Sequence, residues 1–228
     1  MTPELLKELR NHAEKAFPDE ACGVLIEIQG QAVYYPCANA APSPGTMVPA
    51  AFDLVRAEAA GRLLGYCHSH PNALPTPSDT DLAACKRSGL PWWIVQQPGN
   101  LWERVDPIGR PYIGRQYVLG VDDCWSLVRE WYNNEMGFGI QDFERYPEFW
   151  NHGFGPHLEE TGFSPIEEND EVQYGDAMLF RIGAKVATHC GIYLGEGKML
   201  HHFDHSLSRR EELNGKWLKR LVMVVRHK

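Results

Sequence analysis

Hydrophobic residues in the first hundred positions alternate between helical and strand-like spacing. A helical period opens at Thr2-Pro3, a favourable helix start, and Pro18 ends it. Turn residues separate the remaining apolar segments of this half, with a Pro-rich loop over 36–49. These segments predict helices over 52–60 and 78–88 and strands over 24–28, 31–35, 61–70 and 92–96. The alternation predicts a small α/β domain that ends near Val105.

The second half has a different order of elements. The segment 106–116 contains DPIGRPYIG, whose two prolines and two glycines in nine residues are typical of a linker. Beyond it, 124–136 has helical spacing, and 137–173 has few regular signals. Four strand-like runs follow, at 177–182, 189–194, 198–203 and 218–226. One helix followed by strands predicts an α+β domain, so we expect domains over 1–105 and 117–228 joined by the linker 106–116.

The composition limits the class of protein. Hydrophobic residues make up 43% and charged residues 23% of the 228 positions, as in ordinary globular proteins. The longest apolar runs have strand length, far short of the roughly 20 residues that a membrane span needs. The N-terminus MTPELLKELR contains acidic residues and lacks an apolar core, so we expect no export signal. Six scattered cysteines without a CxxC pair predict neither a disulfide framework nor a thiolate zinc site.

The charge of the chain bears on its partners. A net charge of −8 argues against nucleic acid as a partner. Acidic residues concentrate between 117 and 176, and basic residues between 206 and 228. This distribution has two interpretations: two solvated surfaces that pack as neighbours, or a surface for a charged partner.

Two histidines and an aspartate have the spacing of a metal site. His68 and His70 end an apolar strand, where residues i and i+2 point to the same face. A Pro-rich loop then leads to Ser78 and Asp81 at a helix start. Two imidazoles and a carboxylate with an open fourth position are typical of catalytic zinc, and Glu20 is the candidate general base. Simpler interpretations remain, because an HxH pair can be incidental and Ser-x-x-Asp can be a capping box.

The combination of these motifs resembles the JAMM (MPN-type) metallopeptidases. Their pattern is present as Glu20 in DEACGVLI, HSHP at 68–71 and SDTD at 78–81. The resemblance covers residues 1–105 and implies an α/β domain with a mixed sheet and flanking helices. It implies that Glu20 handles the proton of a water molecule and that Ser78 steadies the carbonyl oxygen of the tetrahedral intermediate. It also implies zinc as the cofactor, with the ligands His68, His70 and Asp81.

A cysteine lies at the start of the predicted helix 124–136. Backbone N–H groups and the helix dipole stabilise a thiolate at the position of Cys124. A thiol nucleophile also needs a base, and the base needs an orienting group. His189 and His201 lie on runs joined by the turn GEG, and adjacent antiparallel strands can bring them together. The simpler interpretations are an inert buried cysteine, and histidines at 201–205 that form a polar strand end or another metal site.

These residues resemble the NlpC-type cell-wall peptidases, which have an α+β papain-like core. The matching motifs are DCWSLV at 123–128, GDAMLF at 175–180, HCGIYLG at 189–195 and His201. The resemblance implies that Cys124 attacks the substrate, that His189 accepts its proton and that His201 orients the imidazole. Trp125-Ser126 replaces the common Ser-Gly, and a long acidic stretch precedes the Gly-Asp strand. Both departures leave the specificity open.

The order of the two domains resembles the lambda-K-like tail assembly proteins of long-tailed bacteriophages. The resemblance implies synthesis in the host cytoplasm, transport to the cell wall with the tail tip, and other tail tip proteins as partners. The C-terminal domain would cleave peptidoglycan stem peptides, at a bond following γ-D-glutamate, and the N-terminal domain would process a tail protein or an isopeptide bond. Two alternatives remain: a structural assembly factor with vestigial sites, and a cytoplasmic JAMM isopeptidase that acts on modifier proteins.

Overall fold

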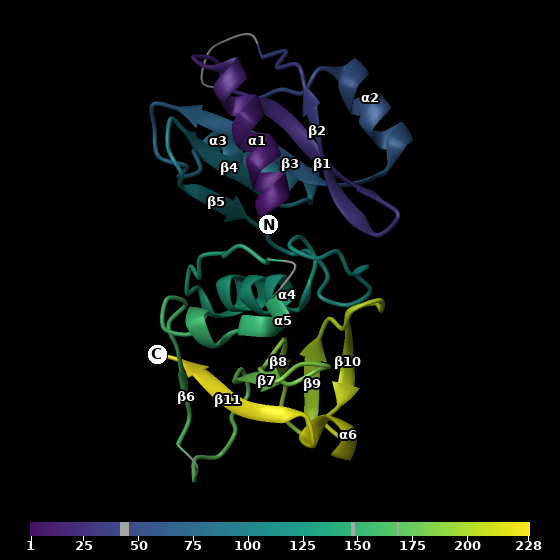
Figure 1. The fold of residues 1–228 in the computed structure, drawn as a ribbon, viewed down its shortest axis with the longest axis vertical. Helices are drawn as coiled ribbons and strands as arrows, with labels where there is room; N and C mark the ends of the chain where they lie inside the picture. Colours follow the sequence, from purple (N-terminus) through teal and green to yellow (C-terminus); the bar gives the residue numbers. More distant parts are fainter. Residues whose placement is uncertain (42–45, 147–148, 168) are drawn as a thin grey trace. The chain divides into compact units, whose positions relative to one another are not determined.

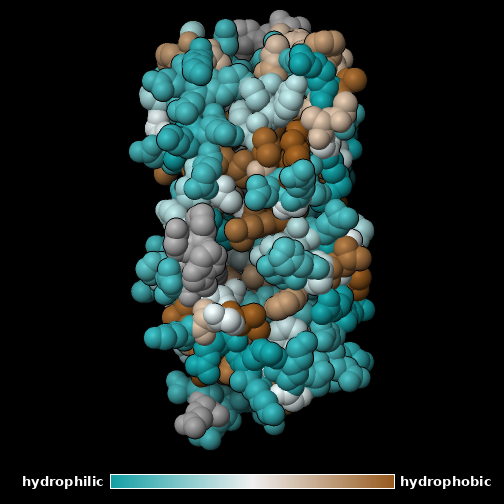
Figure 2. Space-filling model, turned by 45° about the vertical axis from the view of Figure 1, so that its right-hand side comes forward, coloured by the Kyte–Doolittle hydropathy of each residue, from teal (hydrophilic) through white to brown (hydrophobic). Residues whose placement is uncertain are grey.

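The computed structural model describes residues 1–41, 46–146, 149–167 and 169–228. These residues form two compact units, Met1–Arg110 and Pro111–Lys228, each with its own sheet (Figure 1). Part of the Pro-rich loop expected over 36–49 lies outside the described residues. Within the described ranges, no helix combines the length and apolar character that a membrane span requires. On the face drawn in Figure 2, polar side chains surround small apolar patches.

The first unit alternates helices and strands along the chain. Its elements are α1 (Pro3–Ala16), β1 (Cys22–Ile28), β2 (Gln31–Cys37), α2 (Ala51–Ala60), β3 (Arg62–Pro71), α3 (Asp79–Ser88), β4 (Trp92–Gln97) and β5 (Trp102–Val105). The sheet order is β2-β1-β3-β4-β5, with β3 and β4 parallel and the other neighbours antiparallel. The expected α/β architecture with a mixed sheet is confirmed. β5 was not expected, because its sequence WERV is short and half charged.

Helices cover both faces of this sheet (Figure 1). The hydroxyl of the N-cap Thr2 accepts a backbone hydrogen bond from the first turn of α1, which satisfies one otherwise unpaired N–H group. His12 on α1 bonds to the hydroxyl of Tyr34 at 2.8 Å, on the face of the sheet that α1 covers. α2 packs Ala57 against Val24, which points to the opposite face. The two faces of β1 are therefore both buried, and β3 is held centrally beside it.

The second unit places one main helix against an antiparallel sheet. Its elements are α4 (Cys124–Trp131), a π-helical turn (Tyr132–Met136), α5 (Phe149–His152), a 3-10 turn (Gly155–His157), β6 (Phe163–Pro165), β7 (Ala177–Phe180), β8 (His189–Tyr193), β9 (Lys198–His201), β10 (Arg209–Glu212), α6 (Gly215–Leu218) and β11 (Leu221–His227). The sheet order is β10-β9-β8-β7-β11-β6. All its strand pairs are antiparallel. The expected α+β architecture is confirmed.

Several boundaries in this unit differ from the expectation. The helical period expected over 124–136 changes from α to π at Tyr132, the only residue of the π-helical turn that is buried. The run expected as a strand over 218–226 begins as α6, because Asn214 caps a short helix by accepting a hydrogen bond from the N–H of Lys216 at 3.0 Å. β6, α5 and the 3-10 turn lie in the region with few regular signals. Each has only three or four residues, too few for a recognisable period.

Part of the segment expected as a linker has tertiary contacts. The guanidinium of Arg115 makes two hydrogen bonds to the carboxylate of Glu130 on α4, at 2.6 and 2.8 Å. The backbone of Arg115 exchanges bonds with Ser208, and Gly114 donates to the carbonyl of Ser208 at 2.8 Å. Residues 111–116 therefore fold with the second unit.

Candidate active sites

β3 ends with the two histidines of the expected metal site. The Nε2 atoms of His68 and His70 are 3.1 Å apart, because alternate strand residues point to the same face. His70 donates from Nδ1 to the carbonyl of Leu74 at 2.9 Å. That bond leaves the lone pair of His70 on Nε2, facing His68. His68 is buried, and its Nδ1 has no partner within the described part of the chain.

Asp81, in the first turn of α3, completes this group. Its carboxylate oxygens lie 3.3 Å from Nε2 of His68 and 3.5 Å from Nε2 of His70. The same carboxylate accepts hydrogen bonds from the N–H and the hydroxyl of Ser78 at 2.8 and 2.7 Å. The N–H of Asp81 donates to the Ser78 hydroxyl at 3.2 Å, which closes a capping box. The capping and the ligand interpretations therefore do not exclude each other.

Glu20 is held beside the histidines by the strand pairing. It lies two residues before Cys22, the first residue of β1, which pairs with His68. Ser69 points away from the histidines, and its hydroxyl accepts a hydrogen bond from the N–H of Ala21 at 2.9 Å. Burial raises the pKa of Glu20, although its electrostatic interactions with the two histidines oppose this. Ser69 therefore positions the candidate base, a role the sequence did not indicate.

The donor set fits a tetrahedral divalent metal. Two imidazole nitrogens and one carboxylate oxygen lie within 4.8 Å of one another. Zinc bonds of about 2.0–2.2 Å would place neighbouring ligand atoms about 3.3–3.6 Å apart. The separations between the three side chains, at 3.1, 3.3 and 3.5 Å, are close to that range. Although burial opposes it, hydrogen bonds from His68, His70 and Ser78 hold the pKa of Asp81 far below its usual value. Asp81 is therefore ionised, as a metal ligand must be.

The second site starts at the N-terminus of α4. Cys124 is the first residue of this helix, and Asp123 is its N-cap. The Asp123 carboxylate accepts hydrogen bonds from the N–H groups of Ser126 and Gly120, both at 2.8 Å. This cap fixes the first helical turn, and the helix dipole favours negative charge at this N-terminus, where the Cys124 thiol lies.

Arg145 holds this cap from the long segment that precedes β7. Its guanidinium is buried and bonds to the Asp123 carboxylate at 2.8 Å and to the Ser126 hydroxyl at 2.6 Å. It also pairs with Asp142. Although full burial opposes it, the charge and hydrogen bonds of Arg145 keep the pKa of Asp123 far below its usual value. Arg145 thus neutralises a buried carboxylate next to the nucleophile.

His189 begins β8, and His201 ends the neighbouring strand β9. The two strands pair with Gly191 opposite His201, and Nε2 of His189 lies 3.0 Å from Nδ1 of His201. Nε2 of His201 in turn lies 3.0 Å from a carboxylate oxygen of Glu211 on β10. Burial, assisted by the neighbouring His201, His202 and Arg209, lowers the pKa of His189. The imidazole of His189 is therefore neutral near pH 7, which is the form that accepts a proton.

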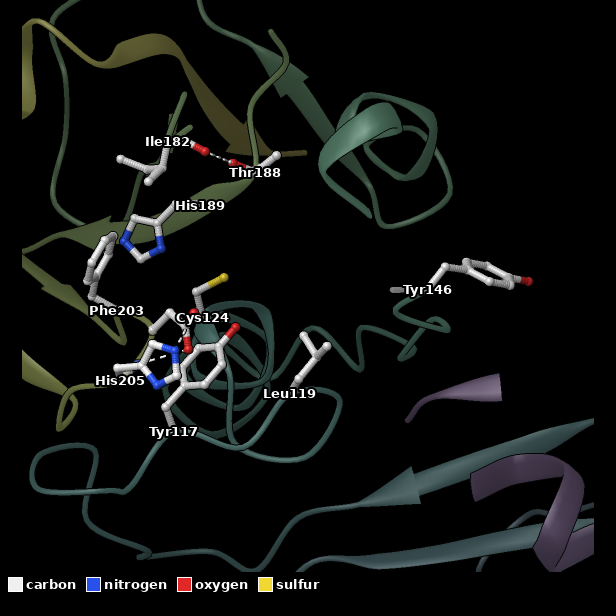
Figure 3. Close-up of a pocket in the computed structure, with 10 residues that line it drawn as sticks. Tyr117, Leu119, Cys124, Tyr146, Ile182, Thr188, His189, Phe203 and His205 are labelled. Atoms are coloured by element: carbon white, nitrogen blue, oxygen red, sulfur yellow. Dashed lines mark hydrogen bonds and ion pairs between the residues drawn. The ribbon is translucent and has the colours of Figure 1, made fainter. Parts of the chain in front are cut away.

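Cys124 and His189 line the same pocket, of about 360 Å³ (Figure 3). Its wall is mostly apolar or aromatic, with a polar rim, and consists of Tyr117, Leu119, Cys124, Tyr146, Ile182, Thr188, His189, Phe203, Asp204 and His205. In Figure 3 the ring nitrogen of His189 nearest to Cys124 is Nδ1, which His201 leaves free. Cys190 points to the opposite face, into the core that contains Cys124. Burial raises the pKa of Cys190.

The structure brings all the expected site residues into two groups. Glu20, Ser78 and the three candidate ligands gather in the first unit, and Cys124, His189 and His201 gather in the second. Residues that support these groups were not found from the sequence: Ser69, Tyr117, Arg145 and Glu211. Of these, only Tyr117 had a local signal, since it lies a few residues before the nucleophile. Burial and the nearby Cys124 raise the pKa of Tyr117, so its hydroxyl stays protonated in the pocket.

Comparisons with known proteins assign both units. Residues 2–105 match the family described as prokaryotic homologs of the JAB domain, and residues 114–226 match the NlpC/P60 family. Tail tip assembly protein K of Escherichia phage N15 is 31% identical over 237 residues, which cover 100% of this chain and 96% of that protein. Tail tip assembly protein K of Escherichia phage lambda is 35% identical over 179 residues, which cover 77% of this chain and 87% of that protein.

A crystal structure of an NlpC/P60 family protein from Bacillus cereus is similar over 97% of this chain and 66% of its own, with 14% identity and a TM-score of 0.38. The family assignment rests on the two relatives, because their similarity extends over most of both sequences. The chain belongs to the tail tip assembly protein K family, with a JAB-related α/β domain followed by an NlpC/P60 domain.

Proposed function

We propose that the second unit is a cysteine endopeptidase with Cys124 as nucleophile, His189 as general base and His201 as the group that orients His189. One observation carries this proposal: a thiol at a helix N-terminus shares a pocket with a neutral imidazole that is hydrogen-bonded to a second imidazole. A nucleophile, a base and an orienting group are the three parts that thiol catalysis requires.

The reaction follows from these positions. Nδ1 of His189 takes the thiol proton while the sulfur of Cys124 attacks the substrate carbonyl carbon. The tetrahedral intermediate then collapses to a thioester, and His189 returns the proton to the departing amine. Water hydrolyses the thioester, with His189 accepting one water proton and passing it to the regenerated thiol. The first-turn N–H groups of α4 stabilise negative charge throughout.

We propose peptidoglycan stem peptides as the substrate, cleaved after γ-D-glutamate. The NlpC/P60 match and the resemblance to cell-wall peptidases support this choice. Membership of the tail tip assembly protein K family supports a place in the phage tail, with other tail tip proteins as partners. The protein would be made in the host cytoplasm and would reach the cell wall at the virion tail tip.

The direct test is digestion of purified peptidoglycan with mass analysis of the products. Wild type should release peptides cut at one bond, and Cys124→Ala and His189→Ala should release none. Cys37→Ala is the matched control, because it removes a buried thiol from β2 of the first unit, away from Cys124, and it should retain cleavage. If wild type releases nothing while it still supports tail assembly, the chain is a structural factor and the enzymatic proposal fails.

For the first unit we propose a zinc-dependent peptidase, on the strength of the convergent donor set. His68, His70 and Asp81 would hold the metal, which supplies a Lewis acid when bound. Glu20 would move the proton of the attacking water, and the Ser78 hydroxyl would hold a substrate oxygen. The substrate would be a tail protein or an isopeptide bond.

Metal analysis tests this second proposal independently of the first. Protein purified without chelators should contain one zinc per chain, and His70→Ala should contain none. Pulse-labelled tail proteins from infections with wild type and His70→Ala should then differ in one processed band. Host isopeptide conjugates that change instead would identify the chain as a modifier isopeptidase, and a zinc-free wild type would refute the metal site.

A further inference from the structure

Glu211 is the last residue in a row of hydrogen-bonded side chains that starts at the pocket and crosses three strands. His201 on β9 lies opposite Gly191 of β8 and Arg209 of β10, so His189 and Glu211, two positions further along those strands, are its diagonal neighbours on the same face. Successive hydrogen-bonding atoms in this row are 3.0 and 3.0 Å apart. His201 is fully buried between the other two residues, and its ring packs edge-on against Trp217 at 4.8 Å. Both ring nitrogens of His201 therefore take part in these hydrogen bonds.

The chemistry of the three groups sets the direction of both hydrogen bonds. An ionised carboxylate can only accept, so Nε2 of His201 must carry the proton that bonds to Glu211. In the neutral imidazole, Nδ1 of His201 is then an acceptor, and Nε2 of His189 must donate to it. The lone pair of His189 consequently lies on Nδ1, the nitrogen that faces the pocket.

Arg209 helps to keep the carboxylate of Glu211 ionised, as the direction of these two hydrogen bonds requires. Arg209 and Glu211 are i and i+2 on β10, so they share a face, and their side chains pair at 2.9 Å. Although burial opposes it, interactions with Trp217, Arg209 and His201 lower the pKa of Glu211 to about 2. Glu211 therefore stays ionised through the pH range in which a peptidase works. The other charged or titratable groups that act on the two histidines are His202 and Arg209.

We propose that Glu211 is a positioning residue of the cysteine peptidase, which selects the His189 tautomer with its lone pair toward Cys124. The proposal rests on the peptidase function assigned above. Beyond Cys124, His189 and His201, the proposal assigns a role to Glu211 as a hydrogen-bond acceptor, although Glu211 does not line the pocket. In serine peptidases, a carboxylate beside the catalytic histidine acts in the same way, and its amide variant has the wrong tautomer.

Glu211→Gln is the diagnostic variant, because a carboxylate can only accept a hydrogen bond whereas an amide can also donate one. The variant keeps the shape of the side chain but no longer enforces one tautomer of His201. The readouts are ¹⁵N NMR of the histidine rings in the full chain and steady-state kinetics on a stem peptide. Glu212→Gln is the matched control, since Glu212 is the exposed neighbour on the same strand.

Wild type and Glu212→Gln should show a single tautomer for His189 and for His201, with the proton of each ring on Nε2. Glu211→Gln should show mixed or inverted tautomers, with kcat lowered about tenfold to hundredfold, below the full contribution of a general base. KM should change by less than about twofold, because Glu211 is outside the pocket. A merely structural role would lower the amount of folded protein without changing the tautomers of the folded fraction.

The proposal is overturned if Glu211→Gln keeps the wild-type tautomers, or if it changes them and keeps the wild-type kcat. The NMR readout needs no substrate, so it tests the role of Glu211 separately from the peptidase activity. A wild type without peptidase activity but with the predicted tautomers would refute the proposed function while the Glu211 contact stands. An active wild type with the opposite tautomers would refute the role of Glu211 alone.

Discussion

At the scale of single residues, the six cysteines differ in how strongly their surroundings favour or oppose the thiolate form. Burial raises the pKa of Cys22, Cys67 and Cys190 strongly and that of Cys37 to about 11. Cys85 is buried, and its thiol donates to the carbonyl of Leu90. Cys124 alone lies at a helix N-terminus and lines a pocket with an imidazole. The thiolate is the reactive form of cysteine, so the six should differ widely in reactivity.

Brief treatment with iodoacetamide near pH 7 should therefore label Cys124 before the others and abolish peptide cleavage. His189→Ala should slow the labelling, because the thiol loses its proton acceptor, and Cys124→Ser should remain unlabelled under the same conditions. Peptide mapping by mass spectrometry gives the site of alkylation. The nucleophile assignment is wrong if another cysteine of the native protein reacts first.

Asp81 combines two roles that substitution can separate. Ser78→Ala removes the side-chain cap of α3, which should lower the free energy of unfolding by about 1 kcal/mol while zinc remains bound. Asp81→Ala removes the cap and a ligand, so it should lose the metal as well as the stability. Zinc content and thermal unfolding of both variants check this prediction. Equal zinc content in the two variants would contradict the ligand role of Asp81.

At the scale of elements, α4 depends on a buried ion pair with the segment before β7. Arg145→Met should leave the Asp123 carboxylate buried and unpaired, which costs about 3–5 kcal/mol of unfolding free energy. Arg181→Met, at an exposed arginine, should change stability little. Urea unfolding measures both. A loss below about 1 kcal/mol in Arg145→Met would show that water or another cation replaces the guanidinium.

The same ion pair predicts a pH dependence. The pKa of Asp123 in the folded protein is below its unfolded value of about 3.9, so the group stabilises the fold fully above that pH. The stabilisation is lost as the pH falls below about 4 toward the folded pKa. The unfolding free energy of wild type should therefore fall through this range. Arg145→Met should show a shallower dependence, because the partner that lowers the pKa is gone.

At the scale of the whole molecule, the extent of the second unit is decided by Arg115. A fragment of residues 111–228 keeps the two hydrogen bonds between Arg115 and Glu130, a residue that is fully buried on α4. A fragment of residues 117–228 removes the Arg115 guanidinium from that buried carboxylate, at a cost of about 3–5 kcal/mol. We expect residues 1–110 and 111–228 each to unfold cooperatively and 117–228 to be much less stable. Equal stability of the two C-terminal fragments would contradict this boundary.

The sequence by itself predicted the order of the main elements and the candidate residues of both sites. Helical and strand periods are local, and so are HSHP, SDTD and the cysteine at a helix start, because each motif occupies one turn or one strand end. The predicted α/β and α+β architectures and the two groups of site residues follow from these local signals. Short elements such as β5, β6 and β10 were missed, since three or four residues do not establish a period.

Only the tertiary structure decided which residues support the sites. Arg145, Glu211 and Arg115 act on partners that are 22, 10 and 15 positions away in the sequence. An arginine or glutamate in a charged stretch has no local feature that distinguishes a solvated side chain from a buried partner. Long-range packing makes that distinction, because it removes water from a carboxylate or an imidazole and leaves one specific side chain to satisfy it.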